Sequence, residues 1–215
     1  MIKNYLLTLF FFSVYWGLNA QSDNDLGLNF GMITYQGDLA QEPINAGRLN
    51  FSTGIQYRNF LSEKFALKAG LNFGKISGSD LDYNISRGIS MENKLVEVAL
   101  QAEWHPLGEN SFEDSGRFDR NFSPFIGLGL GMVFTNESVT YTENRNFKTE
   151  EDTGSLIVVP IDLGIRFAIS PAFSATLHGG TRATFSDLLD GVSENGNADA
   201  NDWYLLGGLG LLYTW

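Results

Sequence analysis

Residues 122–134 read FSPFIGLGLGMVF, a stretch in which large apolar residues alternate with mostly small ones from end to end. One set comprises Phe122, Pro124, Ile126, Leu128, Leu130, Met132 and Phe134, and the other comprises Ser123, Phe125, Gly127, Gly129 and Gly131. Successive side chains of a β-strand point to opposite faces, so the pattern predicts a strand with one wholly apolar face. Because the glycines alternate strictly and no helix follows them, a nucleotide-binding glycine loop is excluded.

The same alternation recurs in seven further segments of the chain. They are residues 26–35, 49–59, 65–74, 96–105, 157–167, 173–185 and 203–215. Eight strands of this kind predict an all-β fold. A transmembrane barrel has its apolar face in lipid, whereas a soluble calycin-type barrel or a sandwich has it turned inward.

Aromatic residues on the apolar face decide between these alternatives, because they gather at the strand ends and avoid the middles. The row expected at the periplasmic ends is Tyr57, Phe65, Trp104, Phe122, Phe167, Phe173, Tyr213 and Trp215. The row expected at the external ends is Phe51, Phe73, Phe134, Phe185 and Trp203. Two aromatic rows that bracket an aliphatic band are typical of a barrel in a bilayer. We therefore predict an eight-stranded antiparallel transmembrane β-barrel of the outer-membrane type.

The connections between the expected strands alternate in length, and outer-membrane barrels combine short periplasmic turns with longer external loops. The long connections are residues 36–46, 77–93, 137–155 and 186–201, and the short ones are 60–64 and 170–172. Residues 106–121 break the rule, because they form a long connection on the periplasmic side. The final residues, Tyr213-Thr214-Trp215, resemble the signal that the outer-membrane assembly machinery reads.

The beginning of the chain predicts an export signal. Lys3 supplies a positive charge, an apolar run covers residues 5–16, and small or polar residues continue to Ala20. A spanning helix needs about 20 apolar residues, so an uncleaved anchor is the weaker alternative. We expect a signal peptide at residues 1–20, a barrel domain at residues 21–215 and a location in the cell outer membrane.

Composition excludes several other classes of protein. The chain has no cysteine, so it carries neither a lipoprotein anchor nor disulfides nor thiolate metal sites. Its formal net charge of −11 argues against a nucleic-acid-binding surface.

Charged residues on the opposite, inward face predict how the lumen is filled. The cations are Arg48, Arg58, Lys68, Arg166 and Arg182, and the anions are Glu97, Glu103 and Asp162. An eight-stranded barrel is just wide enough for side chains to fill its interior. We therefore expect a salt-bridged plug, with a conducting pore as the alternative.

Candidate catalytic and metal-binding residues are few. His105 and His178 are the two histidines of the chain, and we expect neither at the lipid-facing rim beside a serine and a carboxylate. Both are interpreted as hydrogen-bonded lumen histidines. An acidic external segment offers oxygen ligands for Ca²⁺ at Asp187, Asp190, Glu194, Asp199 and Asp202, but their spacing matches no full calcium loop. We therefore predict no enzyme, no cofactor, no metal site and no small-molecule substrate.

Four segments resemble an outer-membrane barrel family of Bacteroidota, a domain of unknown function that includes the PorG component of the type IX secretion system. They are Thr34–Leu39 (TYQGDL), Leu67–Gly78 (LKAGLNFGKISG), Phe122–Gly129 (FSPFIGLG) and Thr184–Ser193 (TFSDLLDGVS). The resemblance covers nearly the whole mature chain, and the last segment is its most specific part.

The resemblance implies a non-enzymatic role, in which a PorG-like barrel links the outer membrane to a periplasmic secretion ring. Residues 106–121 are the expected contact with that ring, since Phe112 and Phe118 lie there among charged residues. Outer-membrane lipid is the other expected partner. A general barrel for envelope integrity or surface adhesion is the alternative, and a lipid-active enzyme is a third.

Overall fold

The computed structural model describes residues 24–37, 39–40, 44, 46–83, 88–109, 121–141, 154–186, 189 and 201–215, apart from the side chain of Tyr83. These residues form eight strands and two short 3₁₀-helices. In chain order they are β1 (Asn24–Gln36), η1 (Ala46–Arg48), β2 (Asn50–Ser62), β3 (Phe65–Ser79), η2 (Asp80–Tyr83), β4 (Ile89–Trp104), β5 (Phe122–Tyr141), β6 (Ser155–Ser170), β7 (Phe173–Thr184) and β8 (Trp203–Thr214). No helix within the described ranges is long and apolar enough to cross a bilayer. The predicted signal peptide, residues 1–20, lies outside the described residues.

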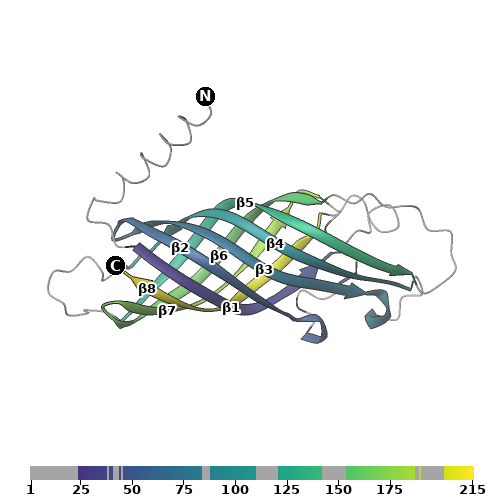
Figure 1. Ribbon diagram of the computed structural model, residues 1–215, viewed down its shortest axis with the longest axis horizontal. Coiled ribbons are helices and arrows are strands. Elements are labelled where there is room, and N and C mark those ends of the chain that lie inside the picture. The colour runs from purple at the N-terminus through teal and green to yellow at the C-terminus, as the bar shows by residue number, and fades with distance from the viewer. Residues whose placement is uncertain are drawn as a thin grey trace, which may run out of the picture.

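The eight strands form one closed antiparallel barrel in which β8 pairs back with β1 (Figure 1). The closing register begins with Asp25 opposite Thr214. Asn24 and Trp215 extend it by exchanging two backbone hydrogen bonds of 3.1 Å. Closure leaves no strand edge unpaired, which a β-structure in lipid requires. The predicted all-β, eight-stranded antiparallel barrel is confirmed.

The outer surface of the barrel carries a broad apolar band. Leu28, Leu128 and Leu163 are 50%, 57% and 59% exposed there, although they are large aliphatic residues. Polar side chains of neighbouring strands, such as Gln56 and Lys68, are buried in the interior. A soluble calycin-type barrel or sandwich would have the opposite distribution, so those alternatives do not describe this chain. The outward apolar face is the one that a bilayer would cover.

The aromatic row at the end of the barrel where β1 begins is formed largely as predicted. The ring of Tyr213 lies 5.9 Å from that of Trp215 and 5.5 Å from that of Phe173, and Tyr57 lies 6.3 Å from Trp215. The prediction that aromatics avoid the middle of the band is wrong at one position. Phe30 faces outward from the middle of β1, where it is 51% exposed and lies opposite Leu209.

Three strands continue five or more residues beyond their predicted external ends. Residues 77–79, 89–93 and 137–141 belong to β3, β4 and β5, although we predicted them as parts of external loops. In Figure 1 these strands reach far toward the end of the barrel opposite the chain terminus marked C.

The polarity of the two faces is reversed in this projecting part, which explains the error. Outside, Lys75 and Glu92 form an ion pair of 2.9 Å. Inside, Ile76, Ile89 and Met91 are almost completely buried. Here the outer face meets water instead of lipid, so the sequence keeps its alternation but exchanges the polar and apolar positions.

The external end of the lumen is filled by an apolar core. Its buried members are Ile33, Tyr35, Leu39, Ile76, Ile89, Met91, Leu95, Val133, Leu156, Val158, Leu189, Tyr204 and Leu206. Two of them come from connections instead of strands, since Leu39 follows β1 and Leu189 precedes β8. The Asn93 side chain donates a 2.6 Å hydrogen bond to the Leu189 carbonyl, which holds Leu189 in this core.

Substituting Leu128 with arginine should destabilise the barrel by about 2–4 kcal/mol, because the charge would lie in the middle of the lipid-facing band. Leu128 pairs with Ala102 on β4 and Ile161 on β6, which also face outward. Urea unfolding of the protein folded into lipid vesicles measures the loss.

The matched control is Ser138→Arg, which lies on the same strand and the same face but beyond the aromatic Phe134. It should cost about 0–1 kcal/mol. Equal losses for the two arginine variants would contradict the assignment of the outer face.

Candidate functional site: the polar interior of the barrel

Between the apolar core and the end where β1 begins, the lumen is lined by charged and polar side chains. The buried charged residues of this region are Asp25, Arg58, Lys68, Glu97, Glu103, Glu109, Asp162, Arg166 and Arg182. They come from β1, β2, β3, β4, β6, β7 and the connection after β4. The network therefore depends on the register of most of the barrel.

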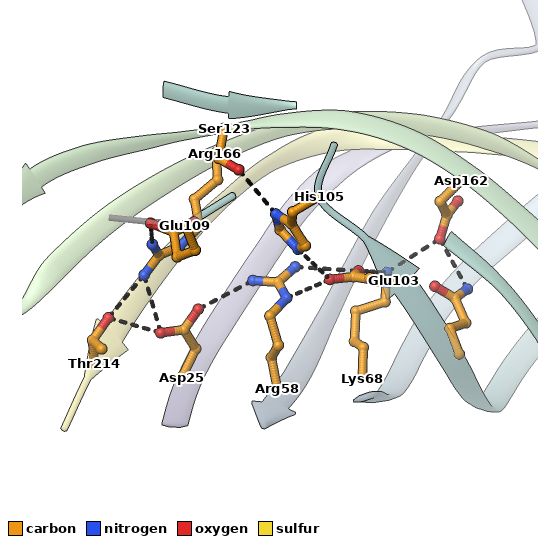
Figure 2. A network of polar contacts seen from close by, with 11 residues as sticks. Asp25, Arg58, Lys68, Glu103, His105, Glu109, Ser123, Asp162, Arg166 and Thr214 are labelled. Carbon is orange, nitrogen blue, oxygen red and sulfur yellow. Dashed lines mark hydrogen bonds and ion pairs between the residues drawn. The ribbon is translucent and has the colours of Figure 1, made fainter. Parts of the chain in front are cut away.

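One half of the network is centred on Arg58, at the end of the barrel where β1 begins (Figure 2). Its Nε donates to Glu103 Oε2 at 2.5 Å and its Nη1 donates to Asp25 Oδ2 at 3.2 Å. Asp25 also accepts a 3.1 Å hydrogen bond from Arg166 Nη2. Arg166 in turn forms an ion pair with Glu109. Each buried cation here contacts two carboxylates.

The other half is centred on Asp162, deeper in the barrel. Its Oδ1 accepts a 2.5 Å hydrogen bond from Arg182 Nη1, and its Oδ2 accepts bonds from Lys68 Nζ at 3.2 Å and Gln101 Nε2 at 2.9 Å. Arg182 also donates from Nε to Glu97 Oε2 at 3.2 Å. Asp162 is thus held by three donors from three different strands.

Lys68 joins the two halves, since its ammonium nitrogen lies 3.0 Å from Glu103 and 3.2 Å from Asp162. Removing a charge from water costs several kcal/mol unless a partner and hydrogen bonds compensate it. The ion pairs across the lumen supply that compensation. The predicted salt-bridged plug is therefore present in the described part of the chain.

The space left in the network is too small for a conducting path. A cavity of about 20 Å³ lies among Lys68, Gln101, Asp162, His178 and Arg182. A single water molecule needs about 10–15 Å³ of such space. This geometry supports the plugged interpretation over the conducting-pore alternative.

His105 lies in a triad-like arrangement that the sequence did not lead us to expect. Its Nδ1 is 3.0 Å from Ser123 Oγ, and its Nε2 is 3.6 Å from Glu103 Oε2. The imidazole is fully buried, with the rings of Phe60 and Phe125 at 5.4 and 5.5 Å. The three residues meet inside the barrel, not at the lipid-facing rim.

The hydrogen bonds of Ser123 with His105 and Gly108 indicate a structural contact, which we call the latch. The Ser123 hydroxyl donates to the Gly108 carbonyl at 2.9 Å, so its proton is not directed at His105. A serine nucleophile would need to give that proton to its base. The Glu109 N–H also donates to the Glu63 carbonyl at 2.7 Å. Together these bonds tie the start of the connection after β4 to the barrel.

Arg48 is an error in the predicted set of lumen charges, whereas Asp25 and Glu109 are omissions from it. Arg48 lies in η1 at the external rim, and its Nε pairs with Asp82 at 2.7 Å. Asp25 has the inward phase of β1 but precedes the predicted start of that strand. Glu109 lies in a connection, where alternation gives no signal. His178 faces the lumen, as predicted.

The acidic external segment is only partly described. Asp187, Asp190, Glu194 and Asp199 lie outside the described residues. Asp202 is buried, and it accepts hydrogen bonds from the Tyr35 hydroxyl at 2.8 Å and from the Leu189 N–H at 3.0 Å. Asp202 therefore stabilises the closed external end of the barrel. Within the described ranges, no group of three or more histidine, aspartate or glutamate side chains is arranged so that it could hold a metal ion.

Substituting Asp162 with asparagine should destabilise the barrel by about 3–5 kcal/mol, because it leaves Lys68 and Arg182 buried beside a neutral group. The matched control is Asp82→Asn, which removes the same charge from the partly exposed pair with Arg48 and should cost at most about 1 kcal/mol. Urea unfolding in lipid vesicles measures both losses. A small loss for Asp162→Asn would contradict the plug as a stabilising unit.

Comparison with solved structures finds small outer-membrane proteins that this chain resembles. Ail, the attachment invasion locus protein of Yersinia pestis crystallised with a heparin analogue, is 10% identical with a TM-score of 0.49, over 91% of this chain and all of Ail. OprG of Pseudomonas aeruginosa is 12% identical with a TM-score of 0.49, over 90% of this chain and 96% of OprG. A major outer membrane protein of Thermus thermophilus is 15% identical with a TM-score of 0.49, over 91% and 100% of the two chains.

A search of curated proteins gives no match. A family model, in contrast, matches residues 3–215, which is almost the whole sequence. The chain that forms this plugged eight-stranded barrel belongs to the family described as Domain of unknown function (DUF6089).

Proposed function

We propose that this protein is a non-conducting structural barrel of the outer membrane, and that it acts through its surfaces and connections instead of its lumen. The observation that carries the proposal is the ionic network from Asp25 to Asp162, which leaves a cavity of about 20 Å³. A transport or pore function needs a continuous aqueous path. The apolar outer band and the row of Tyr57, Tyr213 and Trp215 support placement in a bilayer.

Within that role, we propose a PorG-like component of the type IX secretion machinery that links the outer membrane to a periplasmic complex. The four segments that resemble the PorG-containing family support this assignment. The DUF6089 match gives the family and leaves the role open.

The connection between β4 and β5 is the proposed contact with the periplasmic complex. Its middle, including Phe112 and Phe118, lies outside the described residues. Both ends of this connection are fixed to the barrel. The Glu109 N–H donates to the Glu63 carbonyl, and the Glu109 carboxylate pairs with Arg166. The Asn121 carbonyl accepts a 2.9 Å hydrogen bond from the Ala168 N–H. A long connection on two fixed ends suits a docking element, because its base needs no ordering when a partner binds.

Surface adhesion is the second candidate function, and the projecting ends of β3, β4 and β5 favour it. Above the aromatic row these strands carry polar outer faces that would stand clear of the bilayer, among them Lys75 and Glu92. Such a surface would be available to an extracellular partner. A deletion strain separates the two roles, because loss of proteins bearing the type IX C-terminal signal from the medium is expected only for a secretion component.

Purified protein in planar lipid bilayers should show no steady conductance of porin size, since the ionic network blocks the lumen. Single-channel current recording after reconstitution is the measurement. Folding of the reconstituted protein should be verified by its slower migration after heating, because closed barrels resist detergent unfolding. A stable large current from the folded protein would overturn the non-conducting role.

Replacing residues 111–119 with a short Gly/Asn turn should leave barrel assembly unchanged and impair type IX secretion. The replacement spares Glu109, which pairs with Arg166, and Asn121, which bonds to Ala168. Heat-modifiable migration reports assembly, and secreted cargo in the medium reports function. A comparable replacement within residues 142–153, the segment between β5 and β6, serves as the control. Normal secretion by the first variant would remove the connection from the proposed docking role.

A further inference from the structure

Two lysines lie side by side on the outer surface, directly beyond the external aromatic row. Lys75 on β3 and Lys94 on β4 are register partners, and the alternation of both strands turns their side chains outward. They are the only outward-facing cations on the strands that the structure describes. Residues directly opposite one another on antiparallel strands have Cβ atoms about 4.5–5.5 Å apart, and like charges at that separation repel. The pair therefore calls for a compensating anion.

The depth of this pair is set by the row before it. Phe73, Val96 and Phe134 are register partners across β3, β4 and β5, and the two phenylalanines belong to the external aromatic row. Lys75 and Lys94 come two residues further out along their strands. At about 3.3 Å per residue and a tilt of about 40°, that step is about 5 Å. The headgroup layer on each side of the hydrocarbon core is about 5–7 Å thick, so the lysines lie within it.

The chain compensates this pair of cations only in part. Lys75 forms an ion pair of 2.9 Å with Glu92, which lies on the side away from the aromatic row. Lys94 is exposed, and no carboxylate of the described residues lies within ion-pair distance of it. An ammonium group has three N–H donors, so a single carboxylate uses few of those present. With one carboxylate beside two lysines, this part of the surface is net positive.

The interior of the same barrel shows how such a pair of cations is compensated. Arg58 on β2 and Lys68 on β3 are also register partners, and both are buried in the lumen. Glu103 lies between them, with its carboxylate 2.5 Å from Arg58 Nε and 3.0 Å from Lys68 Nζ. One anion held by both cations thus offsets the repulsion there. The outer pair has the same register geometry, but no carboxylate of the described residues contacts both of its lysines.

We propose that Lys75 and Lys94 together bind the phosphate group of a membrane lipid whose acyl chains lie along the apolar band. A phosphate is the anion that a lipid places in the headgroup layer, and its oxygens accept strong charge-assisted hydrogen bonds. An acidic side chain of a protein partner fits less well, because such a partner would meet the polar rows farther from the bilayer. The site rests on the membrane placement proposed above and adds a lipid ligand to it.

Lipid retention by the purified protein tests the site. The protein is folded into detergent micelles that contain either dipalmitoyl phosphatidic acid or dipalmitoyl glycerol, which lacks the phosphate. Bound lipid is then counted by native mass spectrometry. The attraction of one lysine for an anionic lipid corresponds to about 5-fold in affinity, so two lysines should favour phosphatidic acid about 25-fold.

Three variants and a control locate the effect. Lys75→Gln and Lys94→Gln should each lower the retention of phosphatidic acid about 5-fold, because each removes one cation. Glu92→Gln should raise it by a similar factor, since the carboxylate that competes for Lys75 is gone. An ion pair with a merely structural role would give no such gain. The control is Lys64→Gln, which removes an exposed lysine beside Phe65 at the other end of the barrel and should retain lipid like the wild type.

Equal retention of the two lipids by the wild type would overturn the proposal. So would a decrease for Glu92→Gln, or a loss for Lys64→Gln as large as that for Lys94→Gln. Inorganic phosphate at the concentration of the lipid should not displace it, and displacement would identify free phosphate as the ligand instead. Retention of an acidic polypeptide in place of lipid would also contradict the proposal.

Heat-modifiable migration of each variant verifies that it has folded. That assay and the conductance measurement test the membrane barrel itself. A failure of the lipid site is therefore distinguishable from a failure of the proposed role.

Discussion

Closure of β8 onto β1 is the constraint on which the rest of the structure depends. Lipid offers no partner for a free strand edge, so every backbone donor and acceptor of the barrel wall must be paired with a neighbouring strand. Closure with eight strands also fixes a narrow interior. Charges that share such a space must pair with one another, because water cannot solvate them there. Asp25 connects closure with charge pairing. It is the first residue of the β1–β8 register, and it also accepts hydrogen bonds from Arg58 and Arg166.

The barrel has two regions that follow one another along the same strands. Where the outside is lipid, the inside is ionic and the outside apolar. Where β3, β4 and β5 project past the aromatic row, the inside becomes an apolar core and the outside becomes polar, as in a soluble barrel. Leu39 and Leu189 complete that core from the connections. The external end is therefore closed by hydrophobic packing, and the opposite end is closed by ion pairs.

Because the lumen is closed at both ends, other molecules would meet the barrel at its outer surfaces. The latch of Ser123 and His105 fixes the start of the connection after β4 to the barrel.

The sequence by itself determined the number of strands, the face that meets lipid and most of the lumen charges, because alternation is a local property that needs no knowledge of neighbours. The tertiary structure alone decided which charges meet. Asp162 accepts a hydrogen bond from Lys68, which lies 94 positions away in the sequence. That pairing follows from the register of the strands between them. Arg48 was misplaced and Glu109 was missed for the same reason. Their surroundings come from connections and from neighbouring strands, and those contacts exist only once the barrel has closed.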